Sequence, residues 1–95
     1  MIEYLFNAIR AVAGQEFTIA AKIADESGAL ITSGCALMLH LEDKLVEVEG
    51  TYYEEEHIWQ FTVSAKATEG YKGRFWYCFM ENGKNLCFKE PIYLV

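Results

Sequence analysis

The chain has 95 residues, of which 53% are hydrophobic and 15% are aromatic. This length suits one domain, assigned to residues 1–95, and the composition is that of a chain that folds by itself rather than a disordered one. Fourteen acidic against eight basic residues give a formal net charge of −6, which disfavours nucleic-acid backbones and anionic membrane surfaces as partners.

The first thirteen residues fit two patterns. Their apolar residues recur at helical spacing, yet Tyr4, Phe6 and Ala8 also alternate as in a strand. We favour a strand, with residues 1–7 as an N-terminal arm or an additional strand. Because the segment carries charged residues and has no long apolar stretch, we expect neither a secretory signal nor a transmembrane helix there, and we infer a cytosolic product.

Four further strands are predicted by alternating apolar residues, over residues 16–24, 35–42, 45–56 and 57–63. Asp25 and Gly28 mark the turn after the first of these, because the carboxylate can accept backbone N–H groups and glycine accepts positive φ. Asp43 and Lys44 form another expected turn, and Gly50 interrupts its strand where a bulge or turn would sit. Residues 64–73 have poor strand character and suit one short helical turn around 64–68.

Asn82 and Gly83 predict a β-hairpin near the end of the chain, since a type I′ turn needs positive φ at both central residues. Counting outward gives the pairs Glu81 with Lys84, Met80 with Asn85, Phe79 with Leu86, Cys78 with Cys87, and Tyr77 with Phe88. One face of the hairpin then belongs to the core and holds Phe75, Tyr77, Phe79, Leu86 and Phe88. Pro91 is tolerated only at an edge or a bulge.

Six or seven short strands separated by turn signals predict an all-β fold, an antiparallel sandwich of the immunoglobulin-like or fibronectin-like type.

The chain has three cysteines: Cys35, Cys78 and Cys87. A disulfide scaffold has more cysteines and usually an even number of them, so this count favours a reducing compartment. The predicted pairing of Cys78 with Cys87 makes a bridge geometrically feasible. The simpler interpretation is two buried apolar thiols.

Residues for catalysis or metal binding do not form a recognisable motif, so we expect no enzymatic activity, no cofactor and no metal site. Cys35 and His40 have opposite strand parity and would point to different faces. A nucleophilic pair of Cys78 or Cys87 with His57 would lack an activating environment. The acidic run Glu54, Glu55 and Glu56 is interpreted as a solvated turn.

The second face of the hairpin carries Trp76, Cys78 and Met80, where a solvated strand would carry polar residues. Two interpretations fit: a central strand covered on both sides by its own chain, or an interface with a partner or another subunit. We favour the interface, with Tyr52, Tyr53 and Tyr71 as rim residues.

Three segments, residues 11–19 (AVAGQEFTI), 24–29 (ADESGA) and 73–77 (GRFWY), resemble small immunoglobulin-like domains encoded among bacteriophage tail and baseplate genes. Those domains commonly have an "aGdtf" strand, a "D-x-x-G" turn and a late "G-x-Y-x-Y" strand, and the resemblance covers most of residues 8–95. It implies a non-enzymatic structural component of a virion or prophage. The implied partners are other copies of the chain or other virion proteins, and the implied location is the host cytoplasm during assembly and then the virion. Residues 1–7 and Pro91 depart from the pattern.

An alternative from another class is a ligand-binding module, in which Trp59, Trp76, Tyr52 and Tyr71 form a platform for a sugar or peptide. Trp59 alternates with core residues and is expected to be buried, which weakens this alternative. A third, an acidic mimic of DNA, is disfavoured because lysines interrupt the acidic residues: Lys44, Lys66 and Lys72.

Overall fold

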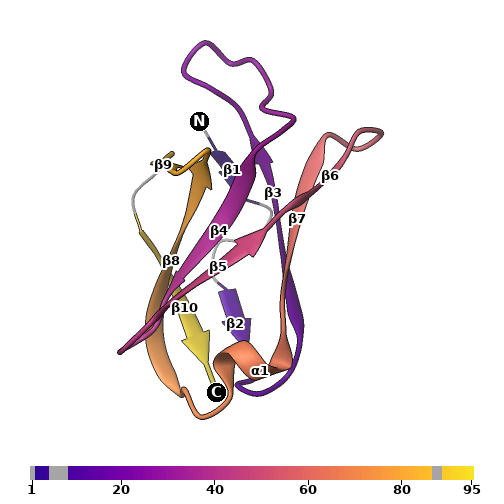
Figure 1. Cartoon of the computed structure of the whole chain (residues 1–95). Coiled ribbons are helices and arrows are strands. Elements are labelled where there is room, and N and C mark those ends of the chain that lie inside the picture. The colour runs from indigo at the N-terminus through magenta and orange to yellow at the C-terminus, as the bar shows by residue number, and fades with distance from the viewer. Residues whose placement is uncertain (1, 5–8, 87–88) are drawn as a thin grey trace.

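Two facing β-sheets make up the molecule in a computed structural model that describes residues 2–4, 9–86 and 89–95, with only the backbone at residues 3 and 4 (Figure 1). Along the chain the elements are β1 (Ile2–Tyr4), β2 (Ile9–Ala11), β3 (Phe17–Ile23), β4 (Cys35–His40), β5 (Leu45–Glu49), β6 (Thr51–Tyr53), β7 (Ile58–Val63), α1 (Ala65–Thr68), β8 (Gly73–Glu81), β9 (Lys84–Asn85) and β10 (Glu90–Leu94).

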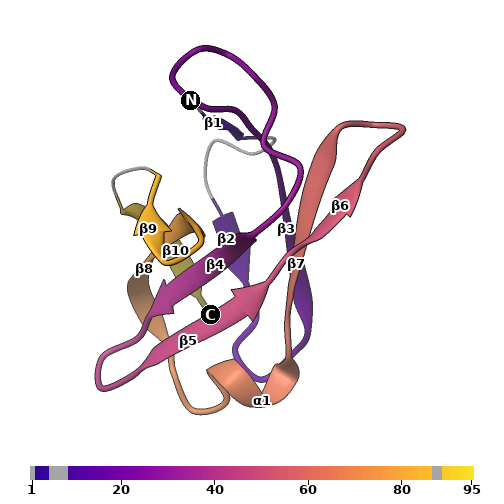
Figure 2. The same ribbon diagram turned by 45° about the horizontal axis from the view of Figure 1, so that its top comes forward.

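One sheet has the strand order β1-β3-β7-β6, and the other has β2-β10-β8-β4-β5 with β9 beside β8. Figure 2 shows β4 and β5 running obliquely to β3 and β7, as expected for two packed layers. This arrangement confirms the predicted all-β, immunoglobulin-like sandwich. The pairing of β2 with β10 is parallel, so the expectation of a purely antiparallel sandwich is wrong at that edge.

The strand count differs from the expected six or seven because three predicted strands are each divided in two. The N-terminal segment forms β1 in one sheet and β2 in the other, so the described residues among 1–13 contain two short strands and no helix. The run from 45 to 56 likewise becomes β5 and β6 in different sheets. The last strand is divided into β9 and β10, and Pro91 occupies the second position of β10, before its described register with β2 begins at Ile92.

Gly50 stands where the chain leaves one sheet for the other, between β5 and β6. A Cβ atom at this position would lie 2.5 Å from Phe61 Cε1 and 2.7 Å from Trp59 Cε3. Only glycine therefore allows the backbone to cross this close to two core rings. The predicted interruption at Gly50 is confirmed, and its cause is contact with aromatic side chains.

The core lies between the sheets and is built from alternate residues of each strand, as the sequence pattern predicts. Strand β4 is buried at every second position, and β3 and β7 show the same alternation. Phe61 and Phe79 meet across the two layers with ring centroids 5.0 Å apart. The fully buried large side chains are Ile19, Ile23, Leu37, Leu39, Phe61, Val63, Phe79, Ile92 and Leu94.

The predicted hairpin turn is present, with φ of 49° at Asn82 and 82° at Gly83. Strands β8 and β9 pair Glu81 with Lys84 and Met80 with Asn85, and the Leu86 amide donates to the Phe79 carbonyl at 3.0 Å. Further along, Tyr77 pairs with Glu90 of β10. The predicted pairing of Tyr77 with Phe88 is therefore wrong, because the register has moved by two residues between β9 and β10. The predicted pairing of Cys78 with Cys87 lies outside the described residues.

The turn after β3 also forms as its residues predict. The Asp25 carboxylate accepts the backbone amides of Ser27 at 2.9 Å and Ala29 at 3.0 Å, and Gly28 has φ of 89°. The hydrogen bond from the Ser27 hydroxyl is the largest cause that lowers the pKa of Asp25, and the hydrogen bond from the Ala29 amide is the next. The short helix α1 confirms the single helical turn expected near residues 64–68.

Candidate interaction surface

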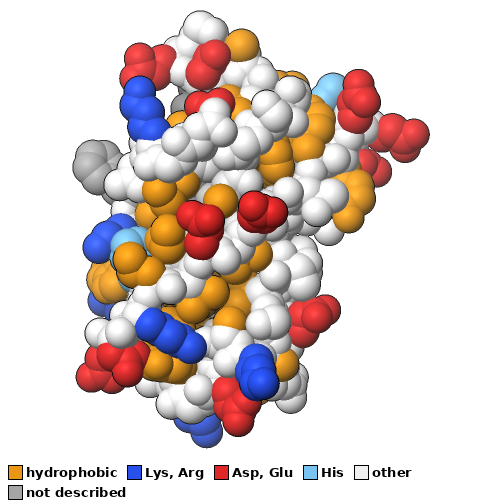
Figure 3. All heavy atoms as spheres, in the orientation of Figure 1, with side chains coloured by type: hydrophobic (Ala, Val, Ile, Leu, Met, Phe, Trp, Pro, Cys, Tyr) orange, Lys and Arg blue, Asp and Glu red, His pale blue; other side chains and the backbone are white. Residues whose placement is uncertain are grey.

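The sheet that contains β8 turns one side to the core and the other away from it. We call the second side the β8 face. Strand register and alternation with the buried residues place these residues on it: Arg10, Ala36, Met38, His40, Leu45, Glu47, Glu49, Arg74, Trp76, Cys78, Met80, Pro91 and Tyr93. In Figure 3 hydrophobic side chains gather over β4 and β8 at the left of the view, with acidic side chains beside them.

Trp76 is the main exposed aromatic residue of β8, with 37% of its surface accessible. It pairs across the sheet with His40 on one side and Pro91 on the other. The guanidinium carbon of Arg74 lies 4.5 Å from the centre of the indole, a cation–π contact that covers part of the ring. Tyr93 of β10, 40% exposed, pairs with Arg74 of β8, so two aromatic rings accompany one cation at this end of the face.

Cys78 and Met80 are less exposed than the predicted continuous apolar stripe requires. Cys78 is only 3% exposed, and Met80 is half-buried. The Sγ atom of Cys78 lies 3.6 Å from His40 Nε2 and 3.9 Å from Asn85 Oδ1. The protein's own β4 and β9 therefore cover the middle of the stripe, which leaves Trp76 as its open end.

His40 is the histidine that meets a cysteine. His57, the histidine that the sequence offers for a Cys–His pair, lies after β6, where its Nδ1 is 3.1 Å from the hydroxyl of Tyr52. The sequence could not select His40, because its proximity to Cys78 depends on β4 and β8 being neighbours. Burial, followed by the positive charge of Lys89, lowers the pKa of His40. The imidazole is consequently neutral at physiological pH.

Charges on the β8 face are separated by sign. Glu47 and Glu49 lie on β5, the described edge strand on one side, where they pair with Met38 and Ala36 of β4. Arg10 lies on β2, at the opposite edge. An acidic edge and a basic edge thus flank an apolar centre.

Tyr52 and Tyr53 lie on β6, in the opposite sheet. Tyr52 packs against the core and against the Trp59 ring, 5.4 Å away between centroids. The structure therefore places neither tyrosine beside Trp76.

Tyr71 precedes β8 and packs edge-on against Phe75, which faces the core. Its hydroxyl donates to Asp43 Oδ1 at 2.5 Å, and Lys44 Nζ lies 5.1 Å from its ring centre. The hydrogen bond to Asp43 raises the pKa of Tyr71. Tyr71 therefore links the turn between β4 and β5 to the start of β8 by a hydrogen bond and ring packing. It does not lie on the β8 face with Trp76.

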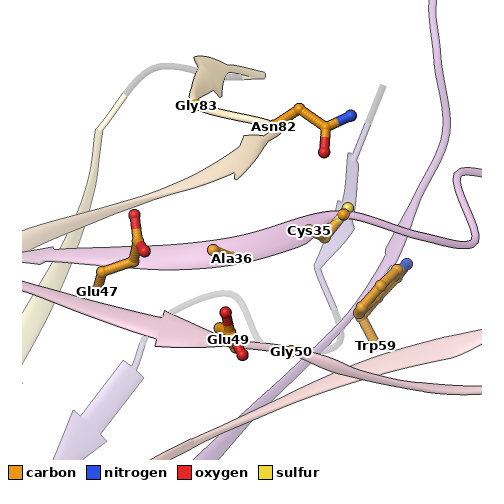
Figure 4. Close-up of a pocket in the computed structure, with 9 residues that line it drawn as sticks. Cys35, Ala36, Glu47, Glu49, Gly50, Trp59, Asn82 and Gly83 are labelled. Atoms are coloured by element: carbon orange, nitrogen blue, oxygen red, sulfur yellow. The ribbon is translucent and has the colours of Figure 1, made fainter.

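A surface hollow lies at the other end of the sheet from Trp76, between the β8–β9 turn and β5. Figure 4 shows Asn82 above Cys35, with Glu47 and Glu49 on the neighbouring strand and Trp59 below. Burial and the charge of Glu81 raise the pKa of the Cys35 thiol to about 11, so it is not a thiolate nucleophile at neutral pH. The indole N–H of Trp59 is satisfied by the Ile31 carbonyl at 2.7 Å.

Among the residues that the structure describes, no three His, Cys, Asp or Glu side chains come together in a way that could hold a metal ion. No helix among the described residues has the length and apolar character to span a membrane. Trp59 is only 3% exposed, so it cannot join Trp76 in an aromatic binding platform.

Comparison with known proteins identifies the fold class. No protein-family model matches the chain, and no curated protein matches it. Among solved structures, the crystal structure of the Lin-41 filamin domain is similar, with a TM-score of 0.72 and 16% sequence identity over 99% of this chain and 91% of that chain. The chain therefore has an immunoglobulin-like β-sandwich fold of the kind seen in that filamin domain.

Proposed function

We propose that this protein is a non-enzymatic structural module that assembles with a second copy of itself through the β8 face. The supporting observation is the layout of that face, which combines exposed Trp76 with an acidic edge on β5 and a basic edge on β2. Exposed apolar surface of this kind, bordered by charges, is typical of protein interfaces.

A two-fold axis through the apolar centre would make the face complementary to itself. In a symmetric dimer each patch meets its own copy, so residue i contacts j and j contacts i. With the two sheets stacked face to face and rotated, Glu47 and Glu49 of one copy lie over Arg10 and Arg74 of the other. Opposite charges then fix the orientation of the two copies, and the rings of Trp76 and Tyr93 contribute apolar contact.

The size of the face sets the expected strength of the dimer. Five strands with an inter-strand spacing of about 4.8 Å span roughly 20 Å. Strands of five or six residues such as β5 and β4 are roughly 17–20 Å long. The flat face therefore covers about 400 Å², below the contact area of about 800 Å² per partner that is usual in stable complexes. We therefore expect a dimer that dissociates on dilution rather than an obligate one.

The proposal is tested with Trp76→Glu, measured by sedimentation and light scattering over a range of concentrations. A carboxylate in the dry centre of the interface should weaken association at least tenfold, or about 1.4 kcal/mol. Thr62→Glu is the matched control, because Thr62 is exposed on the outer side of β7 in the other sheet. Circular dichroism should show both variants folded. A wild type that stays monomeric at high concentration, or a Trp76→Glu protein that unfolds, would contradict the proposal.

Charge reversal tests the orientation separately. Glu47→Arg should weaken the dimer, and adding Arg74→Glu to the same chain should restore it, because each copy then carries the reversed pair. If the double variant dimerises more weakly than Glu47→Arg alone and than Arg74→Glu alone, the two edges do not meet as proposed.

The biological setting we propose is a bacteriophage or prophage structural protein, supported by the resemblance of residues 11–19, 24–29 and 73–77 to small tail and baseplate domains. Neighbouring genes test this directly. A cluster of tail or capsid genes around the coding sequence is the expected result, and a cluster of unrelated metabolic genes would speak against it.

A further inference from the structure

We propose that Cys78, His40 and Met38 form a binding site for monovalent copper, Cu(I), on the β8 face. This inference goes beyond assembly and rests on other observations: the contact between a thiol and an imidazole, and the register of the two strands that carry them.

The spacing of the first two donor atoms suits a shared metal ion. In a three-coordinate site the bonds lie about 120° apart. Metal–sulfur and metal–nitrogen bonds of about 2.3 and 2.05 Å, the lengths usual for zinc, then put the two donors about 3.8 Å apart. Cys78 Sγ and His40 Nε2 lie 3.6 Å apart, so one ion could bind both atoms after a shift of only about 0.2 Å.

The strand register supplies the third donor. Met38 of β4 is the direct cross-strand partner of Cys78 in β8, and both side chains lie on the β8 face. Residues opposite each other on one face of a sheet have Cβ atoms about 4.5–5.5 Å apart. The flexible Met38 side chain can thus turn its thioether sulfur toward the gap between Cys78 and His40.

The donor set identifies the ion. Thiolate and thioether sulfur are soft ligands that select Cu(I), and imidazole also binds copper. Structural zinc sites instead take four ligands from Cys, His, Asp and Glu, and no three such side chains are grouped among the described residues. Two sulfurs and one nitrogen match the low coordination of Cu(I) better than any divalent ion.

Binding would be a simple ligand exchange with no change of oxidation state. Cu(I) replaces the thiol proton of Cys78, the proton is released to solvent, and the neutral His40 ring donates its Nε2 lone pair. The copper–thiolate unit carries no net charge, which suits a cysteine that is only 3% exposed. His40 also lines a surface hollow with Arg74 and Trp76, so this donor residue borders open space.

The experiment titrates the purified protein with Cu(I) held by bicinchoninate, a coloured Cu(I) chelator, under anaerobic reducing conditions. The wild type should withdraw one equivalent of copper. Because loss of a residue that only hydrogen-bonds to a metal ligand typically costs 10–100-fold in affinity, we expect loss of a ligand itself, in Cys78→Ser, to weaken copper binding at least about 100-fold. Met38→Leu keeps the volume of the side chain and should bind about tenfold more weakly. Failure of the wild type to take up copper overturns the proposal.

A control variant separates this site from the buried thiol of β4. Cys35→Ala should bind copper as the wild type does, since Cys35 faces the core on the opposite side of β4. Loss of binding in Cys35→Ala, with Cys78→Ser unaffected, overturns the assignment. X-ray absorption of the loaded wild type should show two sulfurs and one nitrogen around copper; a sulfur-only shell excludes His40 even if Cys78→Ser fails to fold.

Discussion

The two sheets of the sandwich carry very different outer faces. On the outside of the β3–β7 pair, Thr18 pairs with Thr62, and their hydroxyl oxygens are 3.1 Å apart. At the corresponding place on the β4–β8 pair, Met38 pairs with Cys78. A sandwich needs apolar residues only on its inner faces. The polar outer face is thus what folding alone requires, and the apolar one is the observation on which the proposed assembly rests.

The inner faces, by contrast, are equally apolar in both sheets and depend on each other. Phe61 of β7 and Phe79 of β8 are both fully buried and touch across the layers. Substitutions inside the sandwich should therefore harm both sheets together, whereas substitutions outside should separate stability from binding. The predictions below test that division, beginning with the largest effect.

Phe61→Ala should lower the free energy of unfolding by about 3–5 kcal/mol, because it removes a buried ring and leaves a cavity between the sheets. Urea denaturation followed by tryptophan fluorescence and by circular dichroism gives the measurement. Both probes should shift to the same lower midpoint. A loss below about 1 kcal/mol would mean that the sheets can collapse around the gap and are less dependent on each other than we infer.

Gly50→Ala should cost about 1–3 kcal/mol, because the new methyl group overlaps the rings of Phe61 and Trp59 and forces the crossing from β5 to β6 outward. Thr51→Ala is the control, since Thr51 is the neighbouring exposed residue. Thermal unfolding of both proteins provides the comparison. Equal melting temperatures would show that the crossing tolerates a side chain and that the sheets are not tightly coupled there.

Thr18→Val combined with Thr62→Val should change stability by no more than about 0.5 kcal/mol, because an exposed hydroxyl pair gains little over its bonds with water. The association measured for the wild type should also stay unchanged. Chemical denaturation and sedimentation together check this prediction. If the double variant alters the dimer, the β3–β7 face contributes to assembly and the contrast between the two outer faces fails.

Local chemistry in the sequence was enough for the turns and for the inward side of most strands. The Asn82–Gly83 turn, the Asp25 turn, the single helical turn near Ala65 and the buried residues of β3, β4 and β7 were all predicted. Each follows from φ preferences or hydrogen bonds within a few residues, or from the two-residue period of a strand.

The sequence was less informative about the candidate site. Alternation placed Trp76, Cys78 and Met80 on one face. The predicted interface, however, overestimated the exposure of Cys78 and Met80, and it included tyrosines that lie elsewhere. Exposure depends on what covers a residue, and the cover over Cys78 comes from His40 and Asn85 on other strands. No local pattern in the chain marks that contact.

The sequence by itself determined the fold class, the turns and the polarity of each strand, because these depend on neighbours along the chain. The tertiary structure alone decided that β1 and β2 belong to different sheets, that β2 runs parallel to β10, that Tyr77 meets Glu90 and that Cys78 meets His40. These outcomes depend on which distant strands become neighbours, and that choice is made by burying the whole apolar surface at once.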